Sequence, residues 1–240
     1  MASALESLRA EVIECRRCAR LVAWRELVAA TKVARFADQD YWGRPVPGFG
    51  DPRARVVVVG LAPAAHGGNR TGRIFTGDRS GDFLFSSLHR TGFANQPHSV
   101  SRDDGLRLRG MYVAAVNRCC PPGNRPTPQE RDHCLPYLVR ELELLREVRV
   151  VVALGSFAWD GVLRAAAALG HAARPRPRFG HLAEASVGPY ALLGSFHPSQ
   201  QNTFTGKLTP AMLDQVFERA GERAGLGGLA GGRGRVPSSP

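Results

Sequence analysis

The sequence predicts a single-domain α/β fold in three layers, with a central parallel sheet between two layers of helices. Four apolar runs have the length of strands and are apolar on both faces, as strands of a covered parallel sheet are. These runs are residues 54–61, 111–116, 148–154 and 190–196. Helical stretches lie between the runs, and strands that alternate with helices are typical of this fold class. These stretches are residues 81–91, 127–145 and 157–170.

The first fifty residues are expected to be helical and then irregular. Leu8 and Val12 recur near helical spacing among charged residues, which favours helix over residues 2–31. A Cys-Arg-Arg-Cys turn begins at Cys15 and lies between or within these helical pieces. Residues 33–53 are rich in Gly and Pro, which interrupt regular structure.

The chain is expected to end in one helix and a tail. The helix is predicted over residues 210–221. Residues 224–240 are mostly Gly with Arg, Ser and Pro, and their few apolar residues form no stripe. Such a composition cannot bury a core. We therefore expect a folded domain over residues 1–223 and a disordered basic tail over residues 224–240.

The formal net charge is +11 at pH 7, from 32 Lys and Arg against 21 Asp and Glu. This excess favours a polyanionic partner, because basic side chains displace counterions from phosphates. Nearly all of the cations are Arg, however, and a GC-rich genome produces the same bias. No apolar run approaches the roughly 20 residues that span a bilayer, and the N-terminus lacks a signal-peptide core. We expect a cytoplasmic monomer without a membrane partner.

Four of the five cysteines are spaced like ligands of a metal site. Cys15 and Cys18 form a C-x2-C pair, and Cys119 and Cys134 lie in a second segment, with Cys120 beside the first of them. Disulfides are disfavoured inside cells, which leaves metal ligation or inert burial. A four-thiolate site suits zinc or an iron–sulfur cluster. Adjacent cysteines rarely ligate one cluster together, so one of Cys119 and Cys120 is expected to be a spectator.

Two polar loops follow the carboxyl ends of predicted strands, where α/β sheets bind ligands. The loop over residues 60–78 is Gly-Leu-Ala-Pro-Ala-Ala-His-Gly-Gly-Asn-Arg-Thr-Gly-Arg-Ile-Phe-Thr-Gly-Asp. Its small residues let backbone approach a ligand closely, but it is neither a dinucleotide fingerprint nor a P-loop. The second loop, residues 197–209, begins with His197 directly after Leu-Leu-Gly-Ser-Phe, where a polar side chain favours a function over core packing.

These motifs together resemble one known family. The matching segments are Gly-Leu-Ala-Pro-Ala-Ala-His-Gly and Phe-Thr-Gly-Asp in the first loop, Cys-x-Pro-Pro-x-Asn at 119–124, and His-Pro-Ser-Gln-Gln-Asn-Thr-Phe-Thr-Gly from His197. They are similar to family 5 of the uracil-DNA glycosylase superfamily, the UdgB type. The likeness covers residues 10–215 with the motifs in order, and it leaves the tail out.

The resemblance implies a uracil-DNA glycosylase-like fold and a monofunctional DNA-repair enzyme. Such an enzyme flips uracil out of DNA and hydrolyses the N-glycosidic bond, which leaves an abasic site. The partner is then DNA that contains uracil or other deaminated bases. The resemblance also implies a structural 4Fe–4S cluster held by Cys15, Cys18, Cys119 and Cys134, because Cys120 takes a place that varies in the family.

A flipped base needs an apolar face for stacking and polar contacts at its edge. Phe75 is the candidate stacking platform, since relatives carry an aromatic residue at this point; an ordinary core Phe is the alternative. Backbone groups near Ala62 and His66 are candidate contacts to the base edge. Asn124 is the candidate side-chain contact. A turn-forming role is its alternative, and Asn117 is its rival.

Cleavage requires stabilisation of the departing base and of a sugar cation. His197 is the candidate donor to the base anion, as in an oxyanion hole. Sister families carry an acidic or amide residue in the first loop, but residues 61–65 here are Leu-Ala-Pro-Ala-Ala. Asp78 is therefore the candidate carboxylate for the cation or the water, with a helix N-cap as its alternative role. His66 is a further candidate participant.

The small residues of the first loop predict a roomy pocket. We therefore expect hypoxanthine or other damaged bases to be accepted besides uracil. Gln201, Asn202 and Lys207 are candidate DNA contacts in the last loop, whose alternative is an ordinary polar surface. No other lysine lies in the motif loops, so a Schiff-base lyase step is not expected. Four arginines are candidates for additional phosphate contacts, although the sequence favours a solvated surface charge for each one taken singly: Arg70, Arg73, Arg79 and Arg125.

Two competing functions stay open at this point. A non-catalytic iron–sulfur module that binds nucleic acid explains the charge and the cysteines, but it does not explain why polar loops follow the strand ends. A family 4-type glycosylase strictly specific for uracil carries an acidic residue where this chain has Leu61. An assay for cleavage of uracil-containing DNA separates an enzyme from a binding module.

Overall fold

The computed structural model describes residues 4–227, and the four predicted runs form the centre of its sheet. β2 (Val56–Gly60), β3 (Met111–Ala115), β4 (Val150–Leu154) and β6 (Tyr190–Ser195) are parallel and lie in the order β3-β2-β4-β6. Every residue of β2, β3 and β4 is buried, as strands covered on both faces require. The predicted α/β fold class with a parallel central sheet is confirmed.

Two short strands that the sequence did not predict extend the sheet at its edges. β1 (Phe49–Gly50) pairs antiparallel with β3, and β5 (Glu184–Val187) pairs antiparallel with β6. β1 has only two residues and lies in a segment expected to be irregular, while β5 has a single buried residue. Neither has the apolar run of a buried strand. The complete sheet is therefore mixed, with parallel strands at its centre.

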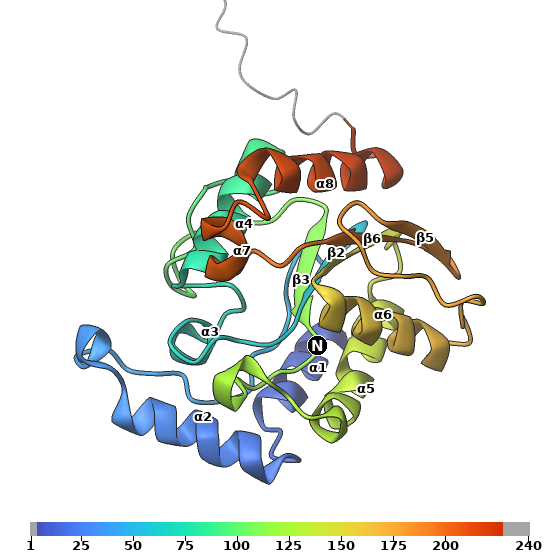
Figure 1. Cartoon of the computed structure of the whole chain (residues 1–240). Coiled ribbons are helices and arrows are strands. Elements are labelled where there is room, and N and C mark those ends of the chain that lie inside the picture. Colours follow the sequence, from blue (N-terminus) through green and yellow to red (C-terminus); the bar gives the residue numbers. More distant parts are fainter. Residues whose placement is uncertain (1–3, 228–240) are drawn as a thin grey trace, which may run out of the picture.

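Helices cover both faces of the sheet and complete the three predicted layers (Figure 1). α4 (Arg79–Arg90) and α8 (Pro210–Arg223) pack on one face, and α5 (Pro128–Leu144) and α6 (Ser156–Ala168) pack on the other. α1 (Ala4–Ile13) packs outside α5. Each face has its own apolar cluster, because alternate residues of a strand point to opposite faces.

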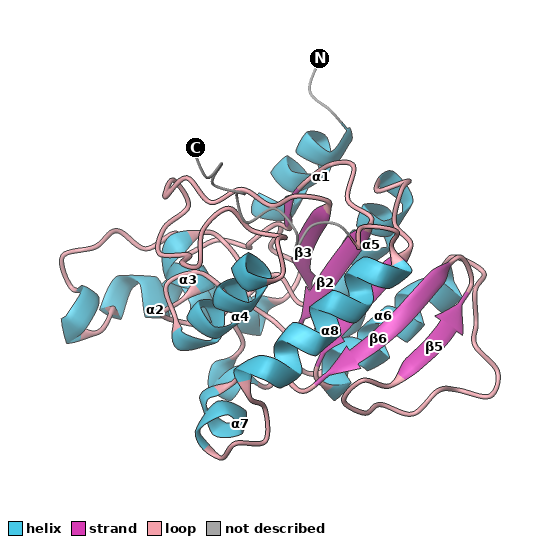
Figure 2. Cartoon of the chain, turned by 90° about the horizontal axis from the view of Figure 1, so that it is seen from above, coloured by secondary structure: helices cyan, strands magenta, loops and turns pink. Residues whose placement is uncertain are grey.

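The N-terminal helices carry the first cysteine pair. α2 (Ala19–Thr31) follows α1 after a turn that contains Cys15 and Cys18, so the predicted helical segment consists of two helices with the predicted turn between them. Figure 2 shows α2 set to one side of the sheet. Four short helical segments complete the described elements: η1 (Ala34–Phe36), α3 (Gly68–Thr71), η2 (Pro122–Asn124) and α7 (Gln200–Phe204).

The last helix ends in a structured cap rather than at the start of a tail. Leu226 donates its N–H to the Gly221 carbonyl at 2.8 Å, and Gly225 adopts a φ of 69°, as in a Schellman motif. Ala224 is 1% exposed, and Leu226 packs against the core. The folded domain therefore continues past residue 223, beyond the expected boundary. The sequence signal was the Ala-Gly-Leu that follows the helix.

The described residues form one layered unit around the sheet (Figure 1). The rest of the expected tail, residues 228–240, lies outside the described residues. Within residues 4–227, no helix has the length and apolar character needed to cross a membrane.

Candidate active site

The loops that follow β2, β3, β4 and β6 meet at the carboxyl edge of the sheet. Asn117 N–H donates to the Leu61 carbonyl at 2.9 Å, which joins the loop after β3 to the loop after β2. Gly155 N–H donates to the Ser195 carbonyl at 2.8 Å, which joins β4 to β6. A Cβ on Gly155 would lie 3.4 Å from the Cβ of His197. The predicted motif loops thus gather where sheets of this class bind ligands.

Phe75 lies across the end of β2 in a strained backbone conformation. Its φ of 54° falls in the left-handed region, which costs a bulky residue of order 1–3 kcal/mol. The ring fills the space beside Gly60, where a Cβ would lie only 2.7 Å from the Cζ of Phe75. The ring centroid is 5.9 Å from that of His197. Because the ring is 7% exposed and also packs with the core, its position is compatible with both a platform and a core role.

His197 is partly buried and lines a cavity of about 270 Å³ together with Leu61, Phe157 and Phe196. Burial lowers the pKa of its imidazole to about 4. The ring is therefore neutral at physiological pH, and a neutral imidazole N–H can still donate to a developing anion. The side-chain amide of Asn202 donates to the His197 carbonyl at 2.8 Å and fixes the backbone there.

Asp78 caps the N-terminus of α4, so the alternative role weighed for it is present. Its Oδ1 accepts a hydrogen bond from the Gly81 amide at 2.9 Å. Its Oδ2 occupies the space that a Cβ on Gly67 would need, which presses the carboxylate against the first motif loop. Burial raises the pKa of Asp78, although the amides of Gly81 and Ser80 oppose this shift. A perturbed pKa is common at functional sites, but the catalytic role stays a prediction.

Two asparagines differ in their surroundings. Asn124 is exposed and ends η2 with a φ of 56°, which fits the turn-forming alternative. Asn117 is fully buried, and neither its Nδ2 nor its Oδ1 has a hydrogen-bond partner. Buried amides without partners are rare, because desolvation costs free energy that only a new hydrogen bond recovers. The geometry therefore favours Asn117 over the predicted Asn124 as the group that meets the polar edge of a ligand.

His66 lies in the first motif loop beside Tyr41, a residue that the sequence did not single out. The Tyr41 hydroxyl is 3.1 Å from Nδ1 of His66. Burial, and then the charges of Arg35 and Arg70, lower the pKa of His66. Ala62 is partly buried in the same loop. Tyr41 comes from the Gly- and Pro-rich segment, where no periodicity marks a buried or functional side chain.

The loop after β6 presents exposed side chains beside the cavity. Gln201 and Lys207 are exposed, and Phe204 is 67% exposed. The guanidinium of Arg79 lies 5.3 Å from the centroid of the Phe204 ring. Aromatic and cationic groups side by side are typical of nucleic-acid surfaces. Asn202 differs from the other predicted DNA contacts, because it uses its amide within the protein.

Two of the four candidate arginines are buried, which fits neither a phosphate contact nor a solvated surface charge. Arg70 is 8% exposed and donates to two backbone carbonyls of the first motif loop. Arg73 is 5% exposed and forms an ion pair with Asp104 at 2.6 Å. Their donors are used inside the protein, contrary to the expectation. Arg79 and Arg125 are exposed and stay candidates.

Four cysteines gather where the turn before α2, the loop after β3, and α5 meet. Burial, and then the charges of Cys134 and Cys15, raise the pKa of Cys18 to about 11. Burial likewise raises the pKa of Cys119 to about 12, with Cys134 and Cys15 again acting on it. Burial also raises the pKa of Cys120, but no other cysteine acts on that thiol. Each of the four predicted ligands thus lies close enough to at least two of the others to affect or feel their charge, whereas Cys120 stands apart from them.

The surroundings of the four thiols fit an iron–sulfur cluster. Arg25 is 2% exposed, and its guanidinium donates to Cys119 Sγ at 3.0 Å, which opposes the rise that burial gives to the pKa of this thiol and would stabilise a thiolate ligand. Nδ1 of His133 lies 3.5 Å from Cys18 Sγ. Within residues 4–227, no three His, Cys, Asp or Glu side chains converge as they do around a single metal ion. A cluster is wider than one ion, so its ligands lie further apart.

Comparison with known proteins identifies the family. Residues 47–221 match the model of the uracil DNA glycosylase superfamily. The chain belongs to this superfamily. It is 54% identical over 227 residues to a type-5 uracil-DNA glycosylase of Mycobacterium bovis, which covers 94% of this chain and 84% of that protein. It is 52% identical over 213 residues to a type-5 enzyme of Thermus thermophilus, which covers 88% of this chain and 94% of that protein.

A type-4 uracil-DNA glycosylase of Archaeoglobus fulgidus is 39% identical over only 114 residues, 47% of this chain and 49% of that protein. The likeness to family 5 of the uracil-DNA glycosylase superfamily is therefore confirmed, and the family 4 alternative has weaker support. Sequence reasoning missed Arg25 at the thiols of this glycosylase. Its signal was present, because Arg25 shares the buried face of α2 with Leu21 and Val28.

Proposed function

We propose that the protein is a DNA-repair glycosylase that flips uracil out of DNA and hydrolyses its N-glycosidic bond, leaving an abasic site. The gathering of His197, Phe75 and Asn117 at the carboxyl edge of the sheet carries the proposal. An aromatic ring, a neutral donor and an unpartnered amide are the groups that a flipped pyrimidine requires. The type-5 uracil-DNA glycosylases that resemble nearly the whole chain support it.

Residues from different loops recognise different parts of the flipped base. Phe75 stacks on the face of the base, and the amide of Asn117 meets its polar edge, which supplies the partners that this buried amide lacks. Backbone groups near Ala62 and His66 contact the base from the first motif loop. The small residues of that loop leave room for hypoxanthine or other deaminated bases besides uracil.

Cleavage separates a base anion from a sugar with cationic character. The neutral imidazole of His197 donates to the departing base and stabilises its developing charge. The carboxylate of Asp78 stabilises the sugar cation or orients the attacking water. Water supplies the hydroxyl that ends on the sugar, and its remaining proton accompanies the base. The reaction is monofunctional, because no lysine serves as a nucleophile in these loops.

DNA contact outside the cavity comes from exposed side chains. Gln201 and Lys207 approach the backbone near the extruded nucleotide, and Arg79 and Arg125 add positive charge. Phe204, 67% exposed, is suited to fill the gap that the flipped base leaves in the stack. The protein acts on DNA as a monomer in the cytoplasm.

The four clustered cysteines are the residues that hold a 4Fe–4S cluster in this proposal. A bound cluster supplies a covalent cross-link among Cys15, Cys18, Cys119 and Cys134, and so ties the N-terminal helices to the sheet. Because Cys119 lies two residues after Asn117, that cross-link also steadies one of the site loops. We assign the cluster a structural role.

A strand-cleavage assay tests the function and its main alternative. Labelled duplex with one uracil is incubated with the protein and then treated with alkali, which breaks the strand at an abasic site. A product after alkali, with none before it and none from a thymine control, supports a monofunctional glycosylase. Binding without cleavage supports instead the non-catalytic iron–sulfur module. A duplex with hypoxanthine tests the wider base range.

A further inference from the structure

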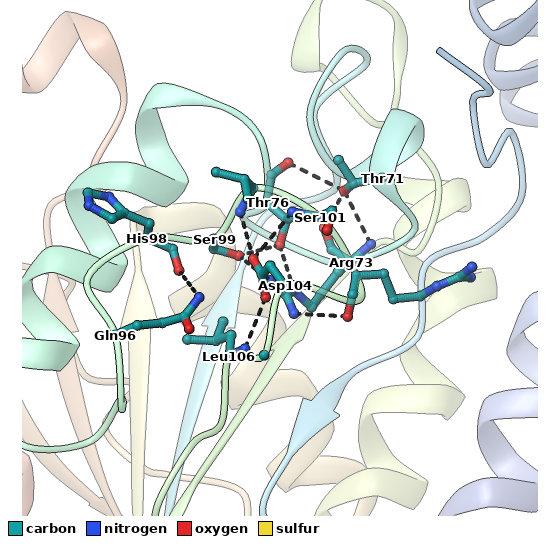
Figure 3. A network of polar contacts seen from close by, with 12 residues as sticks. Thr71, Arg73, Thr76, Gln96, His98, Ser99, Ser101, Asp104 and Leu106 are labelled. Atoms are coloured by element: carbon teal, nitrogen blue, oxygen red, sulfur yellow. Dashed lines mark hydrogen bonds and ion pairs between the residues drawn. The ribbon is translucent and has the colours of Figure 1, made fainter.

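A buried polar network ties the motif loop that carries Phe75 to a second segment of the chain. Figure 3 shows the guanidinium of Arg73 among Thr76, Ser99 and Asp104. Its Nε donates to Thr76 Oγ1 at 3.0 Å, and its Nη2 donates to Ser99 Oγ at 2.8 Å and to Asp104 Oδ2 at 2.6 Å. The hydroxyls of Thr76 and Ser99 are 2.7 Å apart, and both residues are fully buried.

Asp104 anchors the far side of the network. Its Oδ2 accepts the Val100 amide at 2.8 Å, and its Oδ1 accepts the Leu106 amide at 3.0 Å, so the carboxylate organises its own loop. Arg73 Nη1 also donates to the Arg102 carbonyl at 3.2 Å. Burial acts to raise the pKa of Asp104, but the hydrogen bonds from Arg73 and from backbone amides outweigh it and lower that pKa. The carboxylate of Asp104 therefore stays ionised through the physiological range.

The network flanks the strained residue of the loop. Phe75 has a φ of 54°, and its side chain offers no local hydrogen bond that would stabilise a left-handed conformation. Such a conformation persists only where the surroundings hold it. Both flanks are held here: Arg73 binds Thr76 across the turn, and Gly77 N–H donates to the Ser99 carbonyl at 2.7 Å. Residues 73, 76 and 77 are thus fixed, and the chain between them has little freedom.

We propose that Arg73 is a positioning residue for the glycosylase reaction. With its three polar partners it holds Phe75 in the left-handed conformation, so that the ring stays between Gly60 and His197. The proposal rests on the proposed function, in which Phe75 stacks on the flipped base. Small displacements of a group that orients the reacting molecule reduce the rate strongly. Loss of the network should therefore weaken capture of the flipped base and leave DNA affinity unchanged.

The first measurement separates capture from binding. Arg73→Lys keeps the charge but loses the planar fork, and Thr76→Val removes one hydroxyl at constant shape. With 2-aminopurine beside the uracil, fluorescence reports base flipping, while anisotropy reports DNA affinity. We expect the flipped fraction and the single-turnover rate to fall about tenfold in Arg73→Lys and about threefold in Thr76→Val, the range for one hydrogen bond of a buried network. A fall in DNA affinity alone overturns the proposal.

A double-mutant cycle shows whether Arg73 acts through Phe75. Phe75→Ala alone should lower the flipped fraction, and Arg73→Lys should then add no further loss, because the group that it positions is gone. The same tenfold loss in both backgrounds overturns the positioning role. If Phe75→Ala flips and cleaves like the wild type, the platform role in the proposed function fails instead, so the two failures are distinguishable.

A second Arg–Asp ion pair, more exposed than Arg73–Asp104, serves as a control for the loss of an arginine fork elsewhere in the fold. Arg90 donates to Asp214 at 2.7 and 2.8 Å, at the opposite end of α4 from Asp78, and these hydrogen bonds join α4 to α8. Arg90→Lys should flip and cleave at the wild-type level, and an equal loss there overturns the proposal. If Arg73→Lys does not fold, the proposal is tested with Thr76→Val and Ser99→Ala, because each of these removes only one hydroxyl. Wild-type flipping in both of them overturns the proposal.

Discussion

Nη1 of Arg25 lies 3.0 Å from the sulfur of Cys119, and both residues are buried. Because a guanidinium keeps its proton, its burial beside a thiol favours negative charge on the sulfur. Asn69 of the first motif loop donates from its Nδ2 to the Arg25 carbonyl at 3.2 Å. Arg25 therefore links the cysteine cluster to the loop that carries the candidate base contacts.

The first prediction concerns the ligand set. Cys119→Ser should lose iron, whereas Cys120→Ser should keep it, because Cys134 and Cys15 act on the thiol of Cys119 and no other cysteine acts on that of Cys120. Purified wild-type protein should be brown, and iron and sulfide analysis should give a 4Fe–4S cluster. Arg25→Gln should retain iron at purification but release it faster to a chelator. Colourless protein with stoichiometric zinc contradicts the cluster, and equal iron loss in both serine variants contradicts the assignment.

The second prediction concerns the end of the folded domain. Truncation after Gly227 should leave thermal stability and single-turnover cleavage unchanged, with weaker non-specific DNA binding at low salt from the lost basic residues. Truncation after Arg223 should lower the melting temperature, because it removes buried Ala224 and the cap formed by Gly225 and Leu226. Equal melting temperatures for the two truncations would show that the cap contributes nothing to the thermal stability of the domain.

Short stretches of the sequence were enough to predict the central strands and the position of the motif loops. The four central strands were predictable because strands such as β2 and β4 are short, nearly continuous runs of Val, and β-branched residues in a run of this length favour a buried strand. The motif loops were predictable because they follow those strands. For Asp78 the sequence predicts a catalytic carboxylate with a helix N-cap as the alternative, and the cap is present as a hydrogen bond from the Gly81 amide.

The remaining features of the site depend on contacts between residues far apart in the sequence, which local patterns do not reveal. Nothing in the sequence around Arg73 shows that Asp104 will pair with it, so the sequence predicts a surface charge or a phosphate contact where the structure has a buried ion pair. The choice between Asn117 and Asn124 depended on which amide is buried without partners, and neighbouring Pro and Gly do not reveal this. Tyr41 reaches His66 from an irregular segment, where no periodicity marks an inward side chain.

The third prediction separates the two asparagines. Asn117→Ala should lower single-turnover cleavage of uracil about 10- to 100-fold, because the base edge then lacks its buried partner. Asn124→Ala, the matched control, should cleave near the wild-type rate, since Asn124 is exposed. The free energy of unfolding should fall less in Asn117→Ala than for loss of a bonded amide, because this amide has no partner to lose. A slow Asn124→Ala beside a fast Asn117→Ala reverses the assignment.

The fourth prediction concerns Asp78 and separates its cap from its chemistry. Asp78→Asn keeps a good N-cap, whereas Asp78→Ala loses it at a cost of about 1 kcal/mol. Both variants should slow cleavage. Because burial raises the pKa of Asp78, the wild-type rate should fall on acidification at a higher pH than a free aspartate would give, and Asp78→Asn should lack that fall.

The same shift predicts the effect of Asp78 on stability. A raised pKa means that the folded protein binds this proton more tightly than the unfolded chain does, so the stabilising contribution is present at low pH. It is lost as pH rises through the folded-state pKa. Asp78→Asn should therefore be at least as stable as the wild type at pH 7, as thermal unfolding can measure. If Asp78→Asn cleaves at the wild-type rate, Asp78 serves only as the N-cap of α4 and has no catalytic role.

The fifth prediction concerns His197 as a neutral donor. His197→Ala should lower single-turnover cleavage by about 10²–10³, the loss typical for one preorganised donor to a developing anion. DNA affinity should be nearly unchanged, because the side chain lines a cavity rather than the exposed loop. A variant that binds uracil DNA more weakly but cleaves the bound substrate normally contradicts this role.

The pH dependence tests the protonation state of His197. Burial lowers its pKa to about 4, so the wild-type rate should show no ionisation of this residue between roughly pH 5 and 8, where an exposed histidine titrates. Between pH 6.5 and 4 the unfolded chain binds the proton that the folded protein excludes, so stability should fall with decreasing pH across this window. His197→Asn should reduce that slope. NMR titration of the imidazole in the folded protein measures the pKa directly, and a value near 7 would show that a cationic His197, not a neutral donor, faces the departing base.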